Sequence, residues 1–434
     1  MQIHVIGGGL AGCEAAFQAA NYGADVILHE MKPIRFSPAH RLESLCELVC
    51  SNSLKADRLD SASGLLKEEM RLLGSITLQC AAASAVPAGG ALAVDRNVFA
   101  ALVTEKIEGH PRITLVREEM TKIPRDGFVV VCTGPLTDGS LAEDIKTLTG
   151  DSLSFYDAAA PIVYRDSIDM SRAFLGARYG RGGDDYINCP MNQEEYTAFY
   201  EALLSAECAV LHEADHKTVF EGCMPVEVMA SRGMDTLRFG PLRPVGLTNP
   251  ADNSRPYAAV QLRQDNKAGT LFNLVGFQTN LKWGEQKRVF SMIPALHDAV
   301  FARYGVMHRN SFIDSPKVLS PDFSLRAYPN IFFAGQITGV EGYMESAAAG
   351  IMAGMNAFRR ACGQETLVLP RESMLGALSH YISEDTKGVF QPMNANFGLL
   401  PPLNERIRDK RTRYETLSLR SLSHLKDFFA LFTK

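Results

Sequence analysis

The stretch Ile3-His4-Val5-Ile6-Gly7-Gly8-Gly9-Leu10-Ala11-Gly12 decides the fold. A short apolar strand runs into the spacing Gly-x-Gly-x-x-Gly. A helix is then expected from Cys13 to Tyr22, and a second strand from Ala24 to His29 that ends at Glu30. The first glycine allows a tight turn, the second lets the backbone approach a pyrophosphate, and the third lets the helix pack against the strand. The stretch therefore predicts a dinucleotide-binding βαβ unit.

This unit also predicts which groups contact the nucleotide. The helix that follows the glycine turn offers unpaired N–H groups and a positive dipole end to phosphates. Glu30 comes eighteen residues after Gly12, where an acid accepts hydrogen bonds from ribose hydroxyls. We expect the whole turn, Gly7 to Gly12 with Leu10 and Ala11, to lie against the nucleotide together with Glu30.

Composition sets the class of protein. At 434 residues the chain is expected to form two or three domains, and its 46% hydrophobic and 21% charged residues are those of an ordinary globular protein. The net charge of −5 gives no overall basic field, so any RNA-binding surface must be local. Nine cysteines without a CxxC pair argue against a disulfide framework or a zinc site and favour a reducing cytoplasm, and no metal is expected.

Neither a secretion signal nor a membrane span is expected. The first residues already form a strand, without a basic segment before it. The long uncharged stretch Ser75–Val94 is mostly alanine and is broken by Pro87 and by Gly89-Gly90, so it is too weakly apolar to cross a bilayer. We expect a cytoplasmic protein.

Two later elements favour FAD over NAD as the nucleotide. The strand Phe128–Cys132 runs into Thr133-Gly134, and a strand near Phe333 runs into Gly335-Gln336. Gly342-Tyr343 and a small-residue helix, Ser346–Ala357, follow. In glutathione-reductase-like flavoproteins such a late strand, turn and helix closes over the pyrophosphate and the flavin.

The order of these elements predicts an α/β protein with four parts. Residues 1–151 and 311–370 are expected to form the two halves of a glutathione-reductase-like FAD-binding Rossmann domain. Residues 152–310 show aromatic, proline-rich and alternating runs typical of an inserted mixed α/β domain on an antiparallel sheet, and residues 371–434 a helical C-terminal segment. The insertion contains no second Gly-x-Gly-x-x-Gly, so a separate NAD(P)H-binding Rossmann domain is not expected.

Several smaller features are also predicted. The stretch Leu45–Leu54 resembles a short helix that leads into a polar turn, and Gly64–Leu73 and Asn97–Glu108 are expected helices. Trp283, the only tryptophan, is expected to anchor a domain interface. Five bases between Arg406 and Arg413 either form a solvated helix face or contact an RNA backbone.

Most cysteines are expected to be small core residues, among them Cys13, Cys80, Cys132, Cys208 and Cys362. Two differ. Cys50 follows an apolar run and precedes Ser51-Asn52-Ser53, and Cys223 lies between a glycine and a proline with carboxylates nearby. Either could carry a reactive thiolate, and the residues alone do not show which.

The blocks around these two cysteines resemble a known family. Val49-Cys50-Ser51-Asn52-Ser53-Leu54, Pro87 to Arg96 and Phe220-Glu221-Gly222-Cys223-Met224-Pro225 are similar to the bacterial folate- and FAD-dependent tRNA (uracil-5-)-methyltransferase family, TrmFO. So are Tyr304 to Asn310, Gly339 to Tyr343 and Gln391 to Gly398. The resemblance covers nearly the whole chain.

The resemblance implies a reaction. 5,10-Methylenetetrahydrofolate would donate a one-carbon unit, NAD(P)H would reduce FAD, and C5 of the T-loop uridine of tRNA would be the acceptor. Cys223 would add to C6 of the uracil, and Cys50, near the flavin, would assist as an acid/base or as a second thiol. His308 would stack on the folate pterin ring. No obligate protein partner is expected.

Other functions remain open on the sequence. The same chemistry could act on a uridine of ribosomal RNA, and a wobble-uridine tRNA-modifying flavoprotein would share the FAD elements. A small-molecule flavin oxidoreductase, or a flavin-binding protein without catalysis, would carry the same glycine turn.

Overall fold

The computed structural model describes residues 1–209, 224–384 and 390–431. Its first sheet is parallel and five-stranded, with the order β16-β7-β1-β2-β6. The strands are β1 (Gln2–Ile6), β2 (Asp25–Glu30), β6 (Ile113–Arg117), β7 (Phe128–Val131) and β16 (Ile331–Phe333). β1 lies in the centre, with Val5 opposite both Leu28 of β2 and Val130 of β7. The predicted α/β class is confirmed.

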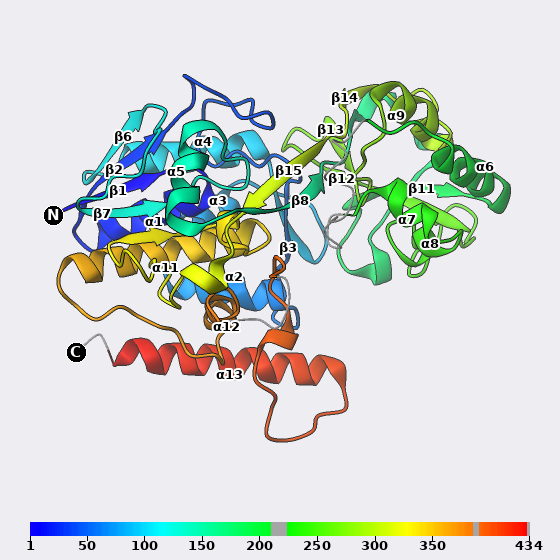
Figure 1. Ribbon diagram of the computed structural model, residues 1–434. Coiled ribbons are helices and arrows are strands. Elements are labelled where there is room, and N and C mark those ends of the chain that lie inside the picture. The colour runs from blue at the N-terminus through cyan, green and yellow to red at the C-terminus, as the bar shows by residue number, and fades with distance from the viewer. Residues whose placement is uncertain (210–223, 385–389, 432–434) are drawn as a thin grey trace.

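Two long helices, α1 (Leu10–Asn21) and α11 (Tyr343–Ala361), pack against each other beside this sheet (Figure 1). Their contact is rich in alanine and glycine, and α11 is buried from Met344 to Ala357. Each helix follows a strand of this sheet: α1 follows β1, and α11 follows β16 after a 3₁₀ turn, Gln336–Thr338. The chain therefore returns after more than 300 residues to complete the layer that it began, as the sequence predicted.

A second sheet is formed entirely by strands between Ile162 and Arg303. It is antiparallel, with the order β10-β11-β12-β13-β9-β14. Its strands are β9 (Ile162–Tyr164), β10 (Phe174–Leu175), β11 (Tyr186–Met191), β12 (Ala258–Gln264), β13 (Leu271–Leu274) and β14 (Phe301–Arg303). The ribbon β8 (Leu153–Ala158) with β15 (Met307–Phe312) connects this lobe to the first sheet (Figure 1).

Shorter elements complete the fold. A three-stranded antiparallel sheet contains β3 (Ser53–Ala56), β5 (Ala91–Val94) and β4 (Ala85–Val86). Further helices are α2 (Ala62–Leu72), α3 (Ile76–Ala83), α4 (Arg96–Glu108), α5 (Gly139–Thr149), α6 (Gln193–Leu204), α7 (Val226–Ser231), α8 (Thr236–Phe239), α9 (Trp283–Phe290), α10 (Ser315–Val318), α12 (Met374–Tyr381) and α13 (Lys410–Ala430). None of the described helices is long and apolar enough to span a membrane.

The prediction of a short helix within Leu45–Leu54 is wrong. Residues 41–52 form an irregular loop, and β3 begins at Ser53. The backbone N–H groups here bond distant partners in place of a helical turn: Leu45 donates to Thr104 Oγ1 and Cys46 to the Gly8 carbonyl. Cys46 also adopts a positive φ of 54°, which a helix does not allow. Tertiary contacts outweigh local helix propensity in this loop.

Three residues that were expected to be buried, Cys208, Cys362 and Trp283, are exposed. Cys208 and Cys362 are exposed, in contrast to the buried Cys13, Cys80 and Cys132. Trp283 does not fill a domain interface, because its side chain is 63% exposed at the start of α9 and stacks on Tyr304 with ring centroids 5.8 Å apart. Each of these residues lies at the edge of an element, where its neighbours in sequence do not determine burial.

The C-terminal segment is only partly helical. α12 and α13 are separated by residues whose described part contains a single 3₁₀ turn, Phe397–Leu399. Of the basic run, Arg406 and Arg408 precede α13, while Arg411 in its first turn pairs with Glu415 at 2.9 Å. Salt bridges within the protein therefore use part of this positive charge.

A buried carboxyl joins the C-terminal helices to α2. Glu69 of α2 accepts hydrogen bonds from the backbone N–H groups of Met374 and Leu375, at the start of α12, and from Ser421 of α13. Burial raises the pKa of the Glu69 carboxyl from 4.5 to about 7. The folded protein therefore holds this proton at pH values where the unfolded chain has lost it.

Stability should consequently fall as the pH rises from 4.5 through 7, by up to about 3 kcal/mol from this group. In Glu69→Gln this contribution to the pH dependence should vanish. Urea unfolding of both proteins between pH 5 and pH 8 measures it, with the exposed Glu365→Gln as the matched control. A wild-type minus Glu69→Gln difference that is constant with pH would contradict this assignment.

Candidate active site

A cavity opens at the carboxyl ends of β1, β2, β7 and β16, where open parallel sheets bind their ligands. Its empty volume is about 1280 Å³, including the part open to solvent. The predicted residues that line it are Gly7, Gly8, Gly9, Leu10, Ala11, Glu30, Thr133, Gly134, Gly335, Gln336 and Tyr343. The structure therefore brings together most of the residues expected to bind the cofactor.

The two remaining predicted glycines, Gly12 and Gly342, lie where an added side chain would not fit. A Cβ on Gly12 would lie 1.7 Å from the Gly7 carbonyl oxygen, so this glycine lets α1 approach the glycine turn. Gly342 precedes α11 with φ 121°, and a Cβ there would lie 2.3 Å from Glu345 Oε2. Gly12 and Gly342 are not among the residues that line the cavity.

The start of α1 is free to bind an anion. Gly9 caps the helix without a side chain, and the first turn contains no acid. A Cβ on Gly9 would meet no atom within 4 Å, so the space above this glycine belongs to the cavity. The N–H groups of the first turn and the helix dipole therefore face a space that fits a pyrophosphate.

Glu30 is held in place at the end of β2. One carboxylate oxygen accepts the Gly8 N–H at 2.8 Å and the other accepts the Lys32 N–H at 2.9 Å. A carboxylate has about four acceptor positions, so it can also accept ribose hydroxyls. Turn, helix end and acid together fit a dinucleotide.

The cavity wall also carries ionisable side chains that the sequence did not single out. Burial, and then nearby Lys32, lower the pKa of His40 to about 4, so this imidazole is neutral at pH 7. Arg35 forms ion pairs with Glu119 and with Asp138, the latter at 2.7 Å. All five residues line the cavity, so they surround any bound nucleotide.

Cys50 lies beside the cavity, next to Val49, which lines it. Its sulfur is 3.0 Å from the hydroxyl oxygen of Tyr343, the first residue of α11. Tyr343 therefore both lines the cavity and contacts the Cys50 thiol, although Cys50 and Tyr343 are 293 positions apart in the sequence. Cys223, the other predicted catalytic cysteine, lies outside the described residues.

His308 lies on β15, opposite Asp157 of β8. Its Nε2 atom is buried and has no hydrogen-bond partner in the described part of the chain. Burial lowers the pKa of His308, and the positive charges of Arg303 and Arg41 lower it further. This ring is not part of the cavity lining.

Comparison with known proteins identifies the family. The family model "GIDA: Glucose inhibited division protein A" matches residues 2–365. The chain is 56% identical over 432 residues to "Methylenetetrahydrofolate--tRNA-(uracil-5-)-methyltransferase TrmFO" of Acetivibrio thermocellus, which covers 99% of each chain. It is 58% identical over 422 residues to the TrmFO of Moorella thermoacetica, covering 97% of each. The chain belongs to the TrmFO family.

Solved structures agree with this fold. GidA of Aquifex aeolicus superimposes with a TM-score of 0.70 in one crystal form and 0.71 in another, at 18% identity. The match covers 98% of this chain and 73–76% of the GidA chain. The Rossmann-type layer and the inserted antiparallel lobe are thus an architecture that the TrmFO family shares with GidA.

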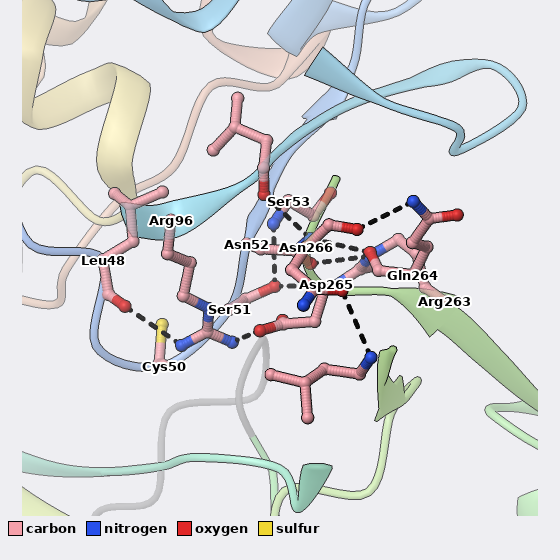
Figure 2. A network of polar contacts seen from close by, with 12 residues as sticks. Leu48, Cys50, Ser51, Asn52, Ser53, Arg96, Arg263, Gln264, Asp265 and Asn266 are labelled. Atoms are coloured by element: carbon pink, nitrogen blue, oxygen red, sulfur yellow. Dashed lines mark hydrogen bonds and ion pairs between the residues drawn. The ribbon is translucent and has the colours of Figure 1, made fainter. Parts of the chain in front are cut away.

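The arginines that bond the Cys50 loop, Arg96 and Arg263, were not identified from the sequence. Figure 2 shows Arg96 between the Leu48 carbonyl oxygen, at 3.0 Å, and the Asp265 carboxylate, also at 3.0 Å. Arg263 of β12 donates to Asn52 Oδ1 at 2.9 Å and to Ser51 Oγ at 3.0 Å. A signal existed for Arg263, because a charged residue directly after the mostly apolar run Ala258–Leu262 must find a polar partner when buried.

The open space above Gly9 allows a direct test of cofactor binding. In Gly9→Val the new side chain should occupy the space for the pyrophosphate, and the φ of −77° accommodates valine. We expect the flavin content of the purified variant, measured by absorbance, to fall at least about tenfold.

Gly284→Val is the matched control. Gly284 is exposed on α9, and a Cβ there also meets nothing within 4 Å. It should retain the wild-type flavin content. Full flavin content in Gly9→Val would exclude the glycine turn as the pyrophosphate site.

Proposed function

We propose that this chain is a folate- and FAD-dependent tRNA (uracil-5-)-methyltransferase. It transfers the one-carbon unit of 5,10-methylenetetrahydrofolate to C5 of the T-loop uridine and uses NAD(P)H as reductant. The observation that carries this proposal is the 56–58% identity to relatives of that name over 97–99% of both chains. The cavity at the glycine turn supplies independent support, because its lining residues fit a dinucleotide and the reaction needs a redox cofactor.

FAD occupies the cavity in this proposal. The turn Gly7–Gly12 and the start of α1 hold its pyrophosphate, and Glu30 holds a ribose. The remaining parts of FAD would be contacted by the other predicted residues of the lining: Thr133, Gly134, Gly335, Gln336 and Tyr343, the first residue of α11. When bound, FAD supplies the reducing equivalents that turn a methylene-level carbon into a methyl group.

The two cysteines perform the chemistry at the uracil. C5 of uracil is a poor nucleophile until a group adds at C6, and a thiolate is suited to that addition. We assign this addition to Cys223: its S–C6 bond forms, and the electron pair moves to C5, which bonds the methylene carbon as one of its two C–N bonds to folate breaks. Loss of the C5 proton to a base expels the remaining folate nitrogen and leaves an exocyclic methylene on C5. A hydride, which reduced FAD would supply, then converts this methylene to methyl as the S–C6 bond breaks and the thiolate leaves. Cys50 assists as the acid/base or as a second thiol.

His308 is the proposed folate contact. Its ring is partly buried near Arg303, and its Nε2 atom has no hydrogen-bond partner among the described residues. A neutral imidazole face stacks on a pterin ring without desolvating a charge. The lowered pKa supports the neutral form at physiological pH.

tRNA is the proposed macromolecular substrate. A T-loop uridine is partly buried within folded tRNA, so the base must be extruded to reach the cavity. The basic run Arg406–Arg413, which includes Lys410 and Arg413, is a candidate for contact with the RNA backbone. The reaction uses cytoplasmic substrates and requires no further protein in this proposal.

A methylation assay tests the function. Purified protein is given an unmodified tRNA transcript, NADPH and labelled 5,10-methylenetetrahydrofolate, and a parallel reaction contains S-adenosylmethionine alone. We expect label in 5-methyluridine of the T-loop only with folate. No label in tRNA from flavin-loaded protein would contradict the proposal. Label in ribosomal RNA would indicate the ribosomal RNA alternative. Modification of tRNA only in the presence of an added GTPase partner would indicate the wobble-uridine-modifying flavoprotein.

Cysteine variants test the assignment of roles in the same assay. Cys223→Ser should abolish methylation because no thiolate adds at C6, and Cys50→Ser should lower the rate by ~100-fold or more. The exposed Cys362→Ser is the control and should match the wild type. A Cys223→Ser enzyme with wild-type turnover would refute the nucleophile assignment.

A further inference from the structure

The Cys50 loop and the start of α11 meet at one hydroxyl group. The Tyr343 oxygen lies 2.9 Å from the Cys50 backbone nitrogen, 3.3 Å from the Ser51 backbone nitrogen and 3.0 Å from the Cys50 sulfur. Both backbone nitrogens are donors, so the tyrosine oxygen must accept from each of them. A phenol oxygen has two lone pairs, and these two contacts use them.

The direction of the hydrogen bond between the Tyr343 hydroxyl and the Cys50 sulfur follows, because both lone pairs of the phenol oxygen are already used. Tyr343 has one O–H hydrogen, and the sulfur of Cys50 is the third atom around its oxygen. The hydroxyl therefore donates to the sulfur. Burial, and then the neighbouring Cys50, raise the pKa of Tyr343 well above its ordinary value, so the phenol keeps this hydrogen throughout the physiological range.

The charges around the sulfur favour a negative ligand atom. Arg263 of β12 and Arg303 of β14 both lie close enough to Cys50 to interact with its charge. Arg96 at the start of α4 holds the carbonyl groups of Leu48 and Val49, just before Cys50. Asp265 faces the same cluster and is paired with Arg96. Three guanidinium groups thus surround the loop with one carboxylate.

The loop cannot easily turn the thiol away. Asn52 donates to the carbonyl oxygens of Val94, at 3.0 Å, and Gln264, at 2.9 Å, while Arg263 binds Ser51 and Asn52 (Figure 2). These bonds attach the loop to β5 on one side and to the end of β12 on the other. The position of the sulfur opposite Tyr343 is therefore fixed before any substrate binds.

We propose that Tyr343 is a positioning residue whose hydroxyl donates a hydrogen bond to Cys50 and holds it as a thiolate, assisted by Arg263 and Arg303. Hydrogen bonds to an ionised acceptor are short and strong, which stabilises the charged form over the thiol. A thiolate at this place can accept the proton released from C5 of the uracil. This use of Cys50 rests on the proposed function, whereas its ionisation does not.

Alkylation of the purified holoenzyme with iodoacetamide tests the proposal. The rate at each cysteine is measured by mass spectrometry of its peptide between pH 5 and pH 10, because only the thiolate reacts. In the wild type, Cys50 should reach half its maximal rate at a lower pH than the exposed Cys362 in the same sample. A midpoint for Cys50 at or above that of Cys362 would overturn the proposal.

Tyr343→Phe then tests the hydroxyl itself. The variant keeps the aromatic ring that lines the cavity and should keep its flavin. The pH at which Cys50 reaches half its maximal alkylation rate should rise by about one unit. Alkylation of Cys50 at neutral pH should therefore be about tenfold slower than in the wild type. Arg303→Gln should raise it in the same direction through the lost charge. Tyr381→Phe is the control: it removes a hydroxyl that donates a hydrogen bond to the Gln391 carbonyl oxygen at 2.9 Å. Its Cys50 alkylation midpoint should match that of the wild type.

The outcomes separate this proposal from the function. A Cys50 midpoint that is unchanged in both Tyr343→Phe and Arg303→Gln would refute the proposal even if the enzyme methylates tRNA. A raised midpoint would support it even if no methylation were found, since alkylation involves neither folate nor tRNA.

Discussion

The close contact between α1 and α11 is the constraint on which the site depends. A Cβ on Gly350 would lie 2.1 Å from the Ala11 carbonyl oxygen, and a Cβ on Gly354 2.3 Å from that of Ala15. Only glycine allows the two backbones to approach this closely. Because both helices begin at the same edge of the sheet, their N-termini converge on one cavity. The same approach brings Tyr343 to the Cys50 loop.

The antiparallel lobe acts on this site through a small set of buried polar bonds. The ion pair between Arg96 and Asp265 has side chains only 10% and 6% exposed, and Arg263 beside it is bonded to Ser51 and Asn52. Such pairs add little net stability but are costly to break singly, so they fix one arrangement of the parts they join. Here they fix the end of β12 against the Cys50 loop. The Cys50 loop is therefore bonded directly to the antiparallel lobe.

The sequence predicted what short-range patterns determine. The glycine turn, Glu30 and the Thr133 and Gly335 turns could be predicted because each lies at the carboxyl end of an apolar strand, and such strand ends share a cavity at one edge of a parallel sheet. It failed for Leu45–Leu54, whose N–H groups bond Thr104, Gly8 and Tyr343 from far along the chain. The contact between Cys50 and Tyr343 could not be predicted, since no local pattern reports on residues 293 positions apart.

A crystal structure of the purified protein with bound FAD tests the central claim most directly. The claim is that the two helix N-termini and the Cys50 loop form a single flavin site. It predicts the pyrophosphate over Gly9 at the start of α1, the flavin ring beside Tyr343, and the Tyr343 hydroxyl still within hydrogen-bond distance of the Cys50 sulfur. A flavin bound elsewhere, or a Cys50 sulfur turned away from Tyr343, would contradict it.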